Sequence, residues 1–387
     1  MKRVKMFLLL IVLMIFSVTA IACSGGSTSS NTPVDNSKET TGNSNVDLSY
    51  VTQQIEQYKT LPEFKAPGEP FDAKAVMKGK SILSIPVSSA NPFTENIEIA
   101  MKNVAKEIGF KFTEWSNQGQ PSQWVQGMNH GINQKYDLID LLGGTNPSVL
   151  QPQVEAAKKA GAKVVSTHLS GFEQQIPYVN ENLGIDYNKA GRLLADWTIL
   201  KTNAKPNILV LISNEVVSTE SIVNGIKDEF QKQFPSAKVT YVNVPIPDWS
   251  TKIQSEVQSA IIRNPELNYV IPIYDSMSQF VVPAIETTQS ADRVKIATFN
   301  GTPFVLDFIR QGKVEVDIGE NLDWIGRAIM DTEMRLVAGL PFVKNENIPL
   351  YIWDKSNIDK AGNPARLSTG YGNAYLEGYN KLWGISK

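Results

Sequence analysis

The sequence has little that suggests an enzyme. It contains one cysteine and two histidines among 387 residues, and no G-x-S-x-G, H-E-x-x-H, Walker A or G-x-G-x-x-G motif. A single cysteine cannot form a disulfide within the chain, so a packed core must stabilise the fold. With 37 Lys and Arg against 39 Asp and Glu, the chain lacks the basic excess of nucleic-acid-binding proteins. These absences argue against an enzyme, a metal site, a cofactor and a nucleic-acid partner.

The first residues have the organisation of a secretory signal. Three positive charges lie within the first five residues, an apolar stretch follows as far as residue 22, and its end is rich in small residues. The stretch is shorter than the roughly 20 residues that span a bilayer, and no later segment is apolar enough to do so. We therefore predict a signal peptide over residues 1–22 and export of the chain.

The end of this segment reads Ala20-Ile21-Ala22-Cys23, which resembles the bacterial lipobox. The resemblance implies that Cys23 is acylated and becomes the first mature residue, with the lipid as the membrane attachment. It implies an extracytoplasmic protein, on the outer surface of a Gram-positive cell or in a periplasm. A lone thiol is more commonly buried, but Cys23 lies between the signal core and a stretch that has no apolar pattern.

The remaining chain divides into a tether, a lead-in and a large folded part. Residues 23–45 are mostly Ser, Gly, Thr and Asn and predict a flexible tether, because they offer too little apolar surface to offset the entropy of ordering. Residues 46–79 predict a lead-in that contains one short helix over 46–58 and several prolines. From residue 80 onward, short apolar strands alternate with amphipathic helices.

This alternation predicts an α/β fold with parallel sheets covered on both faces. Strands are expected at residues 81–87, 111–115, 137–142, 163–167, 207–212, 238–242, 268–273, 294–299 and 313–318. They are too many for one sheet, so we expect two doubly wound, Rossmann-like lobes joined by a multi-strand hinge. The first lobe would comprise residues 80–183 and 322–348, and the second 184–321 and 349–387. A closed (β/α)₈ barrel is the alternative.

Residues that follow the strands are the candidates for a binding site, because ligands of open α/β sheets lie beyond the carboxyl ends of the strands. They combine aromatic rings with amides and carboxylates, which suits a sugar: rings stack on its C–H face and polar groups bind its hydroxyls. The candidates are Asn91, Phe93, Thr94, Trp115, His168, Glu220, Asp248, Trp249, Tyr274, Asp275, Asn300, Glu320 and Asn321. Asn91 and Asn300 also stand in good turn and cap sequences, and Trp115 and Trp124 fit a core equally well.

One glycine pair invites a different reading. Gly143-Gly144-Thr145 follows a predicted strand and precedes a predicted helix, where backbone amides can bind an anion. A tight turn between strand and helix explains the glycines more simply, and we favour the turn.

From Lys80 onward the chain resembles the ribose/galactose-type periplasmic sugar-binding proteins, the receptors of ABC importers. Asn91-Pro92-Phe93 is similar to the N-P-F motif of that family, and Phe299-Asn300-Gly301-Thr302-Pro303 is similar to its F-D-G-T-P segment. Asp248-Trp249 resembles a D-F pair that lines the cleft. The resemblance implies a type I periplasmic-binding-protein fold, non-covalent binding of a sugar between two lobes, a permease and an ATPase as partners, and a monomer.

Two positions depart from the family pattern. His168-Leu169 stands where the ribose type has Asp-Arg, and Glu220 takes the place of an arginine. A cleft containing Glu220, Asp275 and Glu320 would be costly to desolvate unless the ligand supplied donors or positive charge. The sequence therefore favours a sugar, a polyol or an amine-bearing sugar. The full set of predicted ligand-binding residues is Asn91, Phe93, Thr94, His168, Glu220, Trp249, Tyr274, Asp275, Asn300 and Glu320.

Two other functions fit the same fold. A surface-tethered hydrolase could use Glu220 and Asp275 as its acid/base pair. A sensor domain could present its ligand-bound lobes to a membrane kinase. The transport receptor is the reading that the motifs favour.

Overall fold

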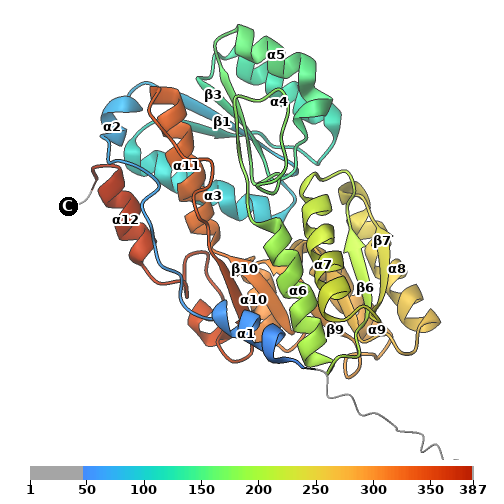
Figure 1. Ribbon diagram of the computed structural model, residues 1–387. Coiled ribbons are helices and arrows are strands. Elements are labelled where there is room, and N and C mark those ends of the chain that lie inside the picture. The colour runs from blue at the N-terminus through green and yellow to red at the C-terminus, as the bar shows by residue number, and fades with distance from the viewer. Residues whose placement is uncertain (1–46, 386–387) are drawn as a thin grey trace, which may run out of the picture. The chain divides into compact units, whose positions relative to one another are not determined.

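The computed structural model describes residues 47–385 and contains two α/β lobes, each built on its own sheet (Figure 1). The predicted signal peptide, Cys23 and the tether lie outside the described residues. Two separate sheets exclude the closed barrel and agree with the two-lobed prediction. Within the described part, no helix is both long and apolar enough to cross a membrane.

The first lobe contains a five-stranded parallel sheet in the order β2-β1-β3-β4-β5. Its strands are β1 (Ser81–Pro86), β2 (Lys111–Glu114), β3 (Leu138–Leu142), β4 (Lys163–Thr167) and β5 (Glu181–Leu183). Successive side chains of a strand point to opposite faces. Ile82 accordingly packs under α3 (Pro92–Ile108) and α11 (Leu322–Ala338), while Leu83 packs under α4 (Pro121–Asn133) and α5 (Gln151–Lys159).

The second lobe contains a six-stranded sheet in the order β11-β10-β9-β8-β6-β7. Its strands are β6 (Asn207–Ile212), β7 (Lys238–Asn243), β8 (Tyr269–Pro272), β9 (Lys295–Asn300), β10 (Val316–Glu320) and β11 (Leu350–Asp354), with β11 antiparallel to β10. One face is covered by α1 (Ser49–Gln57), α6 (Tyr187–Lys201) and α7 (Ser218–Gln233). The other is covered by α8 (Trp249–Arg263), α9 (Ser278–Thr287) and α10 (Pro303–Arg310).

Helices α6 and α7 approach each other closely through two glycines. A Cβ added at Gly191 would lie 2.1 Å from the carbonyl oxygen of Ile222, and one at Gly225 would lie 2.1 Å from that of Asn188. Any side chain at either position would force the two backbones apart. The contact fixes the first turns of both helices, which carry side chains of the site described below.

The chain crosses between the lobes after β5 and after β10, again before β11, and once more between β11 and the C-terminal helix. We expected all of residues 349–387 in the second lobe, and for the C-terminal helix α12 (Ala374–Leu382) this is wrong. Its Tyr375 stacks on Trp324 of α11 with ring centroids 4.8 Å apart, and Tyr379 and Trp383 belong to the same core cluster of the first lobe. The apolar face of α12 is therefore buried against the first lobe, whereas β11 pairs with β10 in the sheet of the second lobe.

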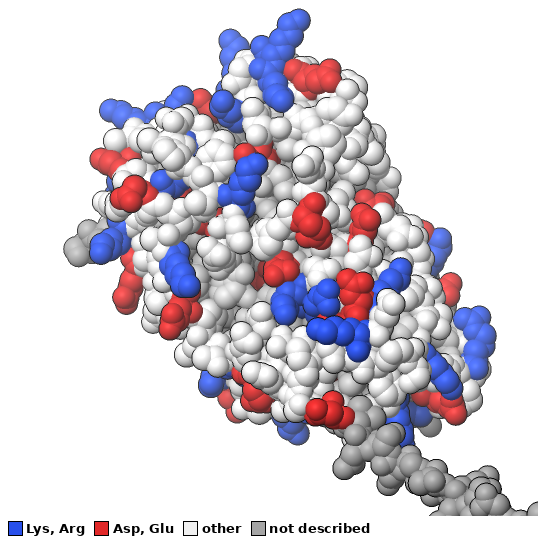
Figure 2. Space-filling model, viewed as in Figure 1, with Lys and Arg blue, Asp and Glu red and all other residues white. Residues whose placement is uncertain are grey.

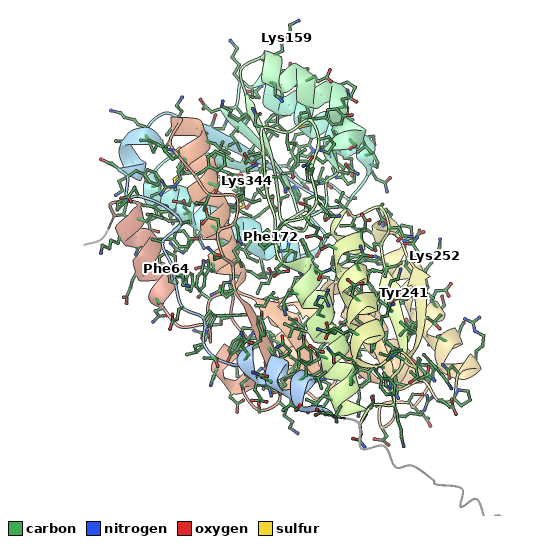
Figure 3. The ribbon with its side chains drawn as sticks, in the orientation of Figure 1. Phe64, Lys159, Phe172, Tyr241, Lys252 and Lys344 are labelled. Atoms are coloured by element: carbon green, nitrogen blue, oxygen red, sulfur yellow. The ribbon has the colours of Figure 1, made fainter. Side chains whose placement is uncertain are left out.

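The lead-in connects the two lobes by a further route, and we term residues 59–72 the strap. At its start, the Lys59 ammonium lies 2.8 Å from a carboxylate oxygen of Asp354 on β11. Further along, Phe64 lies beside α12 (Figure 3). Its ring packs against Tyr379 of that helix, with centroids 5.0 Å apart. The strap ends at α2 (Ala73–Val76) in the first lobe, so it holds both lobes beside the β10–α11 crossing.

Acidic and basic side chains are interspersed on the face shown in Figure 2, and no basic patch gathers there. This distribution matches the near-neutral charge of −2. It offers no electrostatic footprint for a nucleic acid on that face.

Candidate functional site

The candidate site lies where the carboxyl ends of the two sheets meet. In both lobes the first strand along the chain has the second on one side and the third on the other, and the loops that leave such a switch point form a crevice. The first lobe contributes the β1–α3 loop and residues after β2, β3 and β4. The second contributes the start of α6, residues after β6, β7 and β8, and the end of β9.

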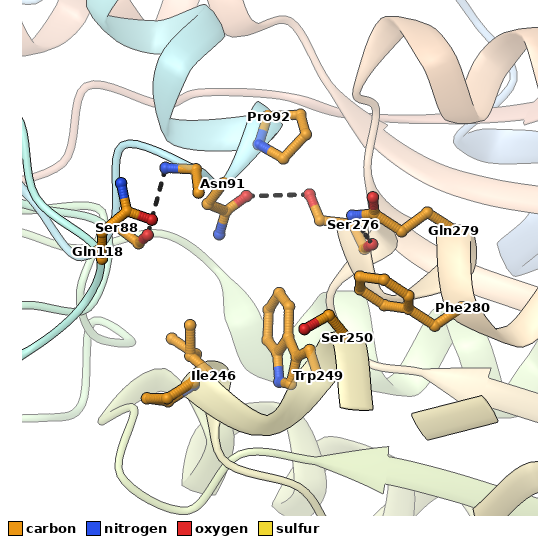
Figure 4. Close-up of a pocket in the computed structure, with 12 residues that line it drawn as sticks. Ser88, Asn91, Pro92, Gln118, Ile246, Trp249, Ser250, Ser276, Gln279 and Phe280 are labelled. Carbon is orange, nitrogen blue, oxygen red and sulfur yellow. Dashed lines mark hydrogen bonds between the residues drawn. The ribbon is translucent and has the colours of Figure 1, made fainter. Parts of the chain in front are cut away.

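These loops enclose two adjoining cavities. The inner cavity has a volume of about 20 Å³ and is lined by Asn91, Phe93, Gly143, His168, Tyr187, Val216, Ser218, Ile246, Trp249, Tyr274, Ser276 and Asn300. The outer cavity has a volume of about 200 Å³ and is lined by Ser88, Ala90, Asn91, Pro92, Gln118, Ile246, Pro247, Trp249, Ser250, Ser276, Gln279 and Phe280 (Figure 4). Four residues face both cavities: Asn91, Ile246, Trp249 and Ser276.

Asn91 joins the two lobes at the boundary of the cavities. Its Oδ1 accepts a hydrogen bond from the backbone N–H of Phe93 at 3.0 Å, which caps α3. The same oxygen accepts a hydrogen bond from the Ser276 hydroxyl of the second lobe at 3.0 Å. The Nδ2 donors of Asn91 have no partner among the described residues, so they are available to a ligand.

His168 makes the second contact between the lobes. It follows β4 with a backbone φ of 50°, and its Nε2 lies 2.9 Å from Oε2 of Glu320, the last residue of β10. On the other side of the ring, Nδ1 lies 2.5 Å from the Tyr187 hydroxyl. The Tyr187 hydroxyl also donates to the His168 carbonyl oxygen at 2.8 Å. Both partners thus fix the orientation of the imidazole in the inner cavity.

Two buried polar atoms beside this network have no protein partner. Oε1 of Glu320 and Nδ2 of Asn321 are unpaired within the described chain, and both side chains are completely buried. Native proteins pair almost all such groups with protein, water or ligand. Glu320 therefore keeps one unpaired acceptor behind His168, and Asn321, whose Oδ1 caps α11, keeps one unpaired donor at the start of that helix.

Aromatic side chains from the second lobe form one wall. The Trp249 and Tyr274 rings stack with their centroids 6.3 Å apart, and the Trp249 indole N–H donates to the Ser213 hydroxyl at 3.0 Å. The Tyr274 hydroxyl lies 2.9 Å from the hydroxyls of Ser218 and Thr219. Burial raises the pKa of Tyr274 above its ordinary value, so the phenol stays neutral and this wall carries no charge.

Asn300 lines the inner cavity, and the neighbouring carboxylates hold the turn that presents it. The backbone N–H of Asn300, which has a φ of 144°, donates to Asp317 at 3.1 Å. Asp275 accepts hydrogen bonds from the backbone N–H of Thr302 at 2.6 Å and from its hydroxyl at 2.8 Å. Burial raises the pKa of Asp275 to about 7. Asp275 thus supports the turn and lines neither cavity, contrary to the prediction.

The structure brings together six of the ten predicted ligand-binding residues: Asn91, Phe93, His168, Trp249, Tyr274 and Asn300 all line the inner cavity. Glu320 lies one contact away, behind His168. Thr94 points inward instead, and its hydroxyl donates to the Ser88 carbonyl at 2.9 Å. Glu220 is exposed on the first turn of α7. The predicted acidic pocket is therefore wrong, because its three carboxylates are exposed, bound to a turn or paired with histidine.

The other tryptophan and aspartate candidates form bonds within the protein and line neither cavity. The Trp115 indole donates to the Gln123 carbonyl, the Trp124 indole donates to the Val87 carbonyl, and Asp248 binds Lys252. Gly143 and Gly144 have φ values of 68° and 126°, which suit the tight turn. The chain then enters a 3₁₀ turn that runs directly into α5, and Gly143 lines the inner cavity. Sequence reasoning missed Tyr187, Ser218 and Ser276. The latter two lie just beyond β6 and β8, so the rule that found Asn91 could have found them.

Comparisons with known proteins agree with this architecture. A family model described as "periplasmic binding protein domain" matches residues 82–341. No curated protein matches the chain.

Several solved structures share the fold. A solute-binding protein of an ABC transporter from Agrobacterium vitis, with bound allitol, has a TM-score of 0.66 at 18% identity and covers 74% of this chain and 99% of its own. The myo-inositol-binding protein of Caulobacter has a TM-score of 0.64 at 16% identity, covering 75% and 97%. A protein from Actinobacillus succinogenes with bound D-allose has a TM-score of 0.64 at 16% identity, covering 72% and 99%. At these identities the likeness concerns the fold, and it confirms the type I architecture.

Proposed function

Because the chain belongs to the periplasmic binding protein family, we propose that it is the lipid-anchored receptor of an ABC importer and binds a neutral sugar or polyol between its lobes. Proteins of this family bind solutes for transport and are not enzymes. The hydrolase alternative also lacks its acid/base pair, since Glu220 is exposed and Asp275 holds a buried turn.

The composition of the cleft carries this proposal. Its polar groups are amides, hydroxyls and one histidine, its walls are aromatic, and no Asp, Glu, Lys or Arg lines either cavity among the described residues. Flat rings and neutral hydrogen-bonding groups suit the C–H faces and hydroxyls of a sugar. The neutral lining removes the argument for an amine-bearing ligand. The allitol, myo-inositol and D-allose bound by the structural relatives are neutral too.

The mechanism follows from the contacts that cross the cleft. An inner cavity of about 20 Å³ has room for roughly one water molecule, so a sugar enters only when the lobes separate. Separation breaks the Asn91–Ser276 hydrogen bond and frees the Ser276 hydroxyl and the Asn91 amide for the solute. Closure then excludes water and strengthens each hydrogen bond, and the closed receptor presents both lobes to the permease.

Replacing Asn91→Asp is expected to lower ligand affinity roughly tenfold to a hundredfold, about 1.4–2.8 kcal/mol, because it exchanges the free amide donors for a charge that faces a neutral solute. The capping oxygen is kept, and Asp is as good an N-cap as Asn, so the melting temperature should hardly change. Titration calorimetry with the ligand identified by mass spectrometry of the purified protein measures the loss.

The matched control is Glu220→Gln, which removes a carboxylate that the structure places in solvent. It should leave affinity within about twofold of the parent. Equal affinity of the Asn91→Asp variant and the parent would contradict the site. Turnover of the ligand into a product would contradict the receptor function. In cells, uptake of labelled ligand that depends on this chain would favour an importer, and kinase signalling without uptake would favour a sensor.

The lipid anchor is tested separately. Replacing Cys23→Ser should prevent acylation, because the lipobox cysteine supplies the acylated thiol, and should move the protein from the membrane fraction to the medium or periplasm. Immunoblots of cell fractions and labelling with radioactive palmitate measure both effects. A Cys23→Ser variant that remains in the membrane fraction would rule out this anchor, while ligand binding should be the same for both proteins.

A further inference from the structure

The outer cavity is about ten times as large as the inner one, at about 200 Å³ against about 20 Å³. It lies beyond the Asn91–Ser276 hydrogen bond, between the β1–α3 loop of the first lobe and the starts of α8 and α9 in the second (Figure 4). A solute ring held against His168, Tyr187 and Asn300 does not reach all of this space. The remaining space is large enough for a further group on the solute.

The lining of the outer cavity indicates the chemistry of that occupant. Trp249 and Phe280 place two aromatic rings on the side of the second lobe. Gln118 and Gln279 bring side-chain amides from opposite lobes. Only Nε2 of Gln279 is bonded, to the Ser276 carbonyl at 2.9 Å, so its Oε1 and the Gln118 amide are available. The absence of a charged side chain from the described lining disfavours an ionic group, such as a phosphate or carboxylate, on the solute.

The two cavities are continuous apart from one contact. Asn91, Ile246, Trp249 and Ser276 line both of them, and the Asn91–Ser276 hydrogen bond of 3.0 Å is what separates them. A solute that replaces this bond occupies the boundary, so a substituent on the solute projects directly into the outer cavity. Trp249 then contacts both parts of the same molecule.

We infer that the outer cavity is a subsite for a second ring, so that the preferred solute is a neutral disaccharide or glycoside and not a free monosaccharide. The second ring lies against Trp249 and Phe280, and the amides of Gln118 and Gln279 bind its polar edge. The inference rests on the proposed sugar-binding function and specifies its substrate class.

Titration calorimetry with matched probes tests this inference. D-glucose is compared with cellobiose and phenyl β-D-glucoside, and D-galactose with lactose and phenyl β-D-galactoside. Within the series that binds, at least one two-ring probe should bind ten- to a hundredfold more tightly than the monosaccharide, since ring stacking and burial of the second ring add to the affinity. Phe280→Ala should reduce that ratio at least fivefold. The control Phe172→Ala removes an aromatic ring that is 47% exposed and lines neither cavity, and should preserve the ratio.

The possible outcomes distinguish the second-ring subsite from the proposed receptor function. Binding of a monosaccharide with no gain from any second ring would overturn the subsite and leave the sugar receptor intact. A gain that Phe280→Ala does not reduce would overturn the placement of the second ring. Failure of all six probes to bind, together with a co-purified molecule that is no sugar or polyol, would overturn the proposed function and the subsite with it.

Discussion

The protein is expected to unfold at a higher temperature at pH 5.5 than at pH 8.5. Several carboxyl groups are buried without a salt bridge, and burial raises their pKa: Glu98 to about 8, Asp140 to about 7, Asp196 to about 8 and Glu346 to about 8. In the unfolded chain these groups titrate near pH 4. Between about pH 4 and pH 8 the folded state therefore holds more protons, and its stability falls as the pH rises.

The expected size of this effect is large because several groups act in the same direction. Each pKa unit corresponds to about 1.4 kcal/mol, so even one unit from each of four groups amounts to about 5 kcal/mol. A loss of about 2–3 kcal/mol between pH 5.5 and 8.5 would lower the melting temperature by roughly 3–4 °C in a chain of this size. Asp354 has the opposite effect on the pH dependence of stability, since hydrogen bonds from Lys59 and Ser356 lower its pKa. Its contribution is lost only below about pH 4, outside this window.

Differential scanning calorimetry across this pH range measures how the melting temperature changes with pH, and we term this change the slope. In the Glu98→Gln variant the slope should be shallower, because glutamine cannot ionise at a site that is 5% exposed. Glu220→Gln, at an exposed site, should preserve the parent slope. A melting temperature that is constant or rises between pH 5.5 and 8.5 would show that these carboxyl groups ionise without cost.

The alternation of strands and helices was readable from the sequence, because each buried strand is an apolar run of about five residues between amphipathic helices. Two strands were not predicted. β5 is a three-residue edge strand of polar composition, Glu181–Leu183. β11 is fully buried, but it pairs antiparallel with β10 after the chain has crossed between the lobes. Nothing local in Leu350–Asp354 specifies that partner.

The site residues could be predicted from the sequence wherever the order of the strands alone determines their position. Asn91, Trp249 and Tyr274 follow strands and Asn300 ends one, and the sheet order brings those strand ends together. The carboxylates were misjudged because their partners are remote in sequence. Asp275 binds Thr302, 27 positions away, and Glu320 meets His168 across 152 positions. Such pairings exist only in the folded chain.

Replacing Phe64→Ala is expected to lower the free energy of unfolding by about 1–3 kcal/mol, less than the 3–5 kcal/mol of a fully buried phenylalanine, because Phe64 is half-buried. Its ring lies directly over Gly378 of α12, where an added Cβ would be only 2.0 Å from Cε1 of Phe64. Thermal melting measures the loss. The control Leu61→Ala alters a residue of the same strap that is 48% exposed and should cost less than about 0.5 kcal/mol.

The same substitution should also widen the range of lobe separations. Between the Lys59–Asp354 ion pair in the second lobe and the Phe64 contacts in the first, the strap has five residue steps of at most about 3.6 Å each. While both ends hold, this length limits how far the two anchor points separate. Spin labels at Lys159→Cys on α5 and Ile262→Cys on α8, in a Cys23→Ser background, report the interlobe distance. A broader and longer distribution in Phe64→Ala, reversed by ligand, is the expected result. An unchanged distribution would mean that the strap packs against both lobes without restraining them, and that the four other interlobe crossings set the opening by themselves.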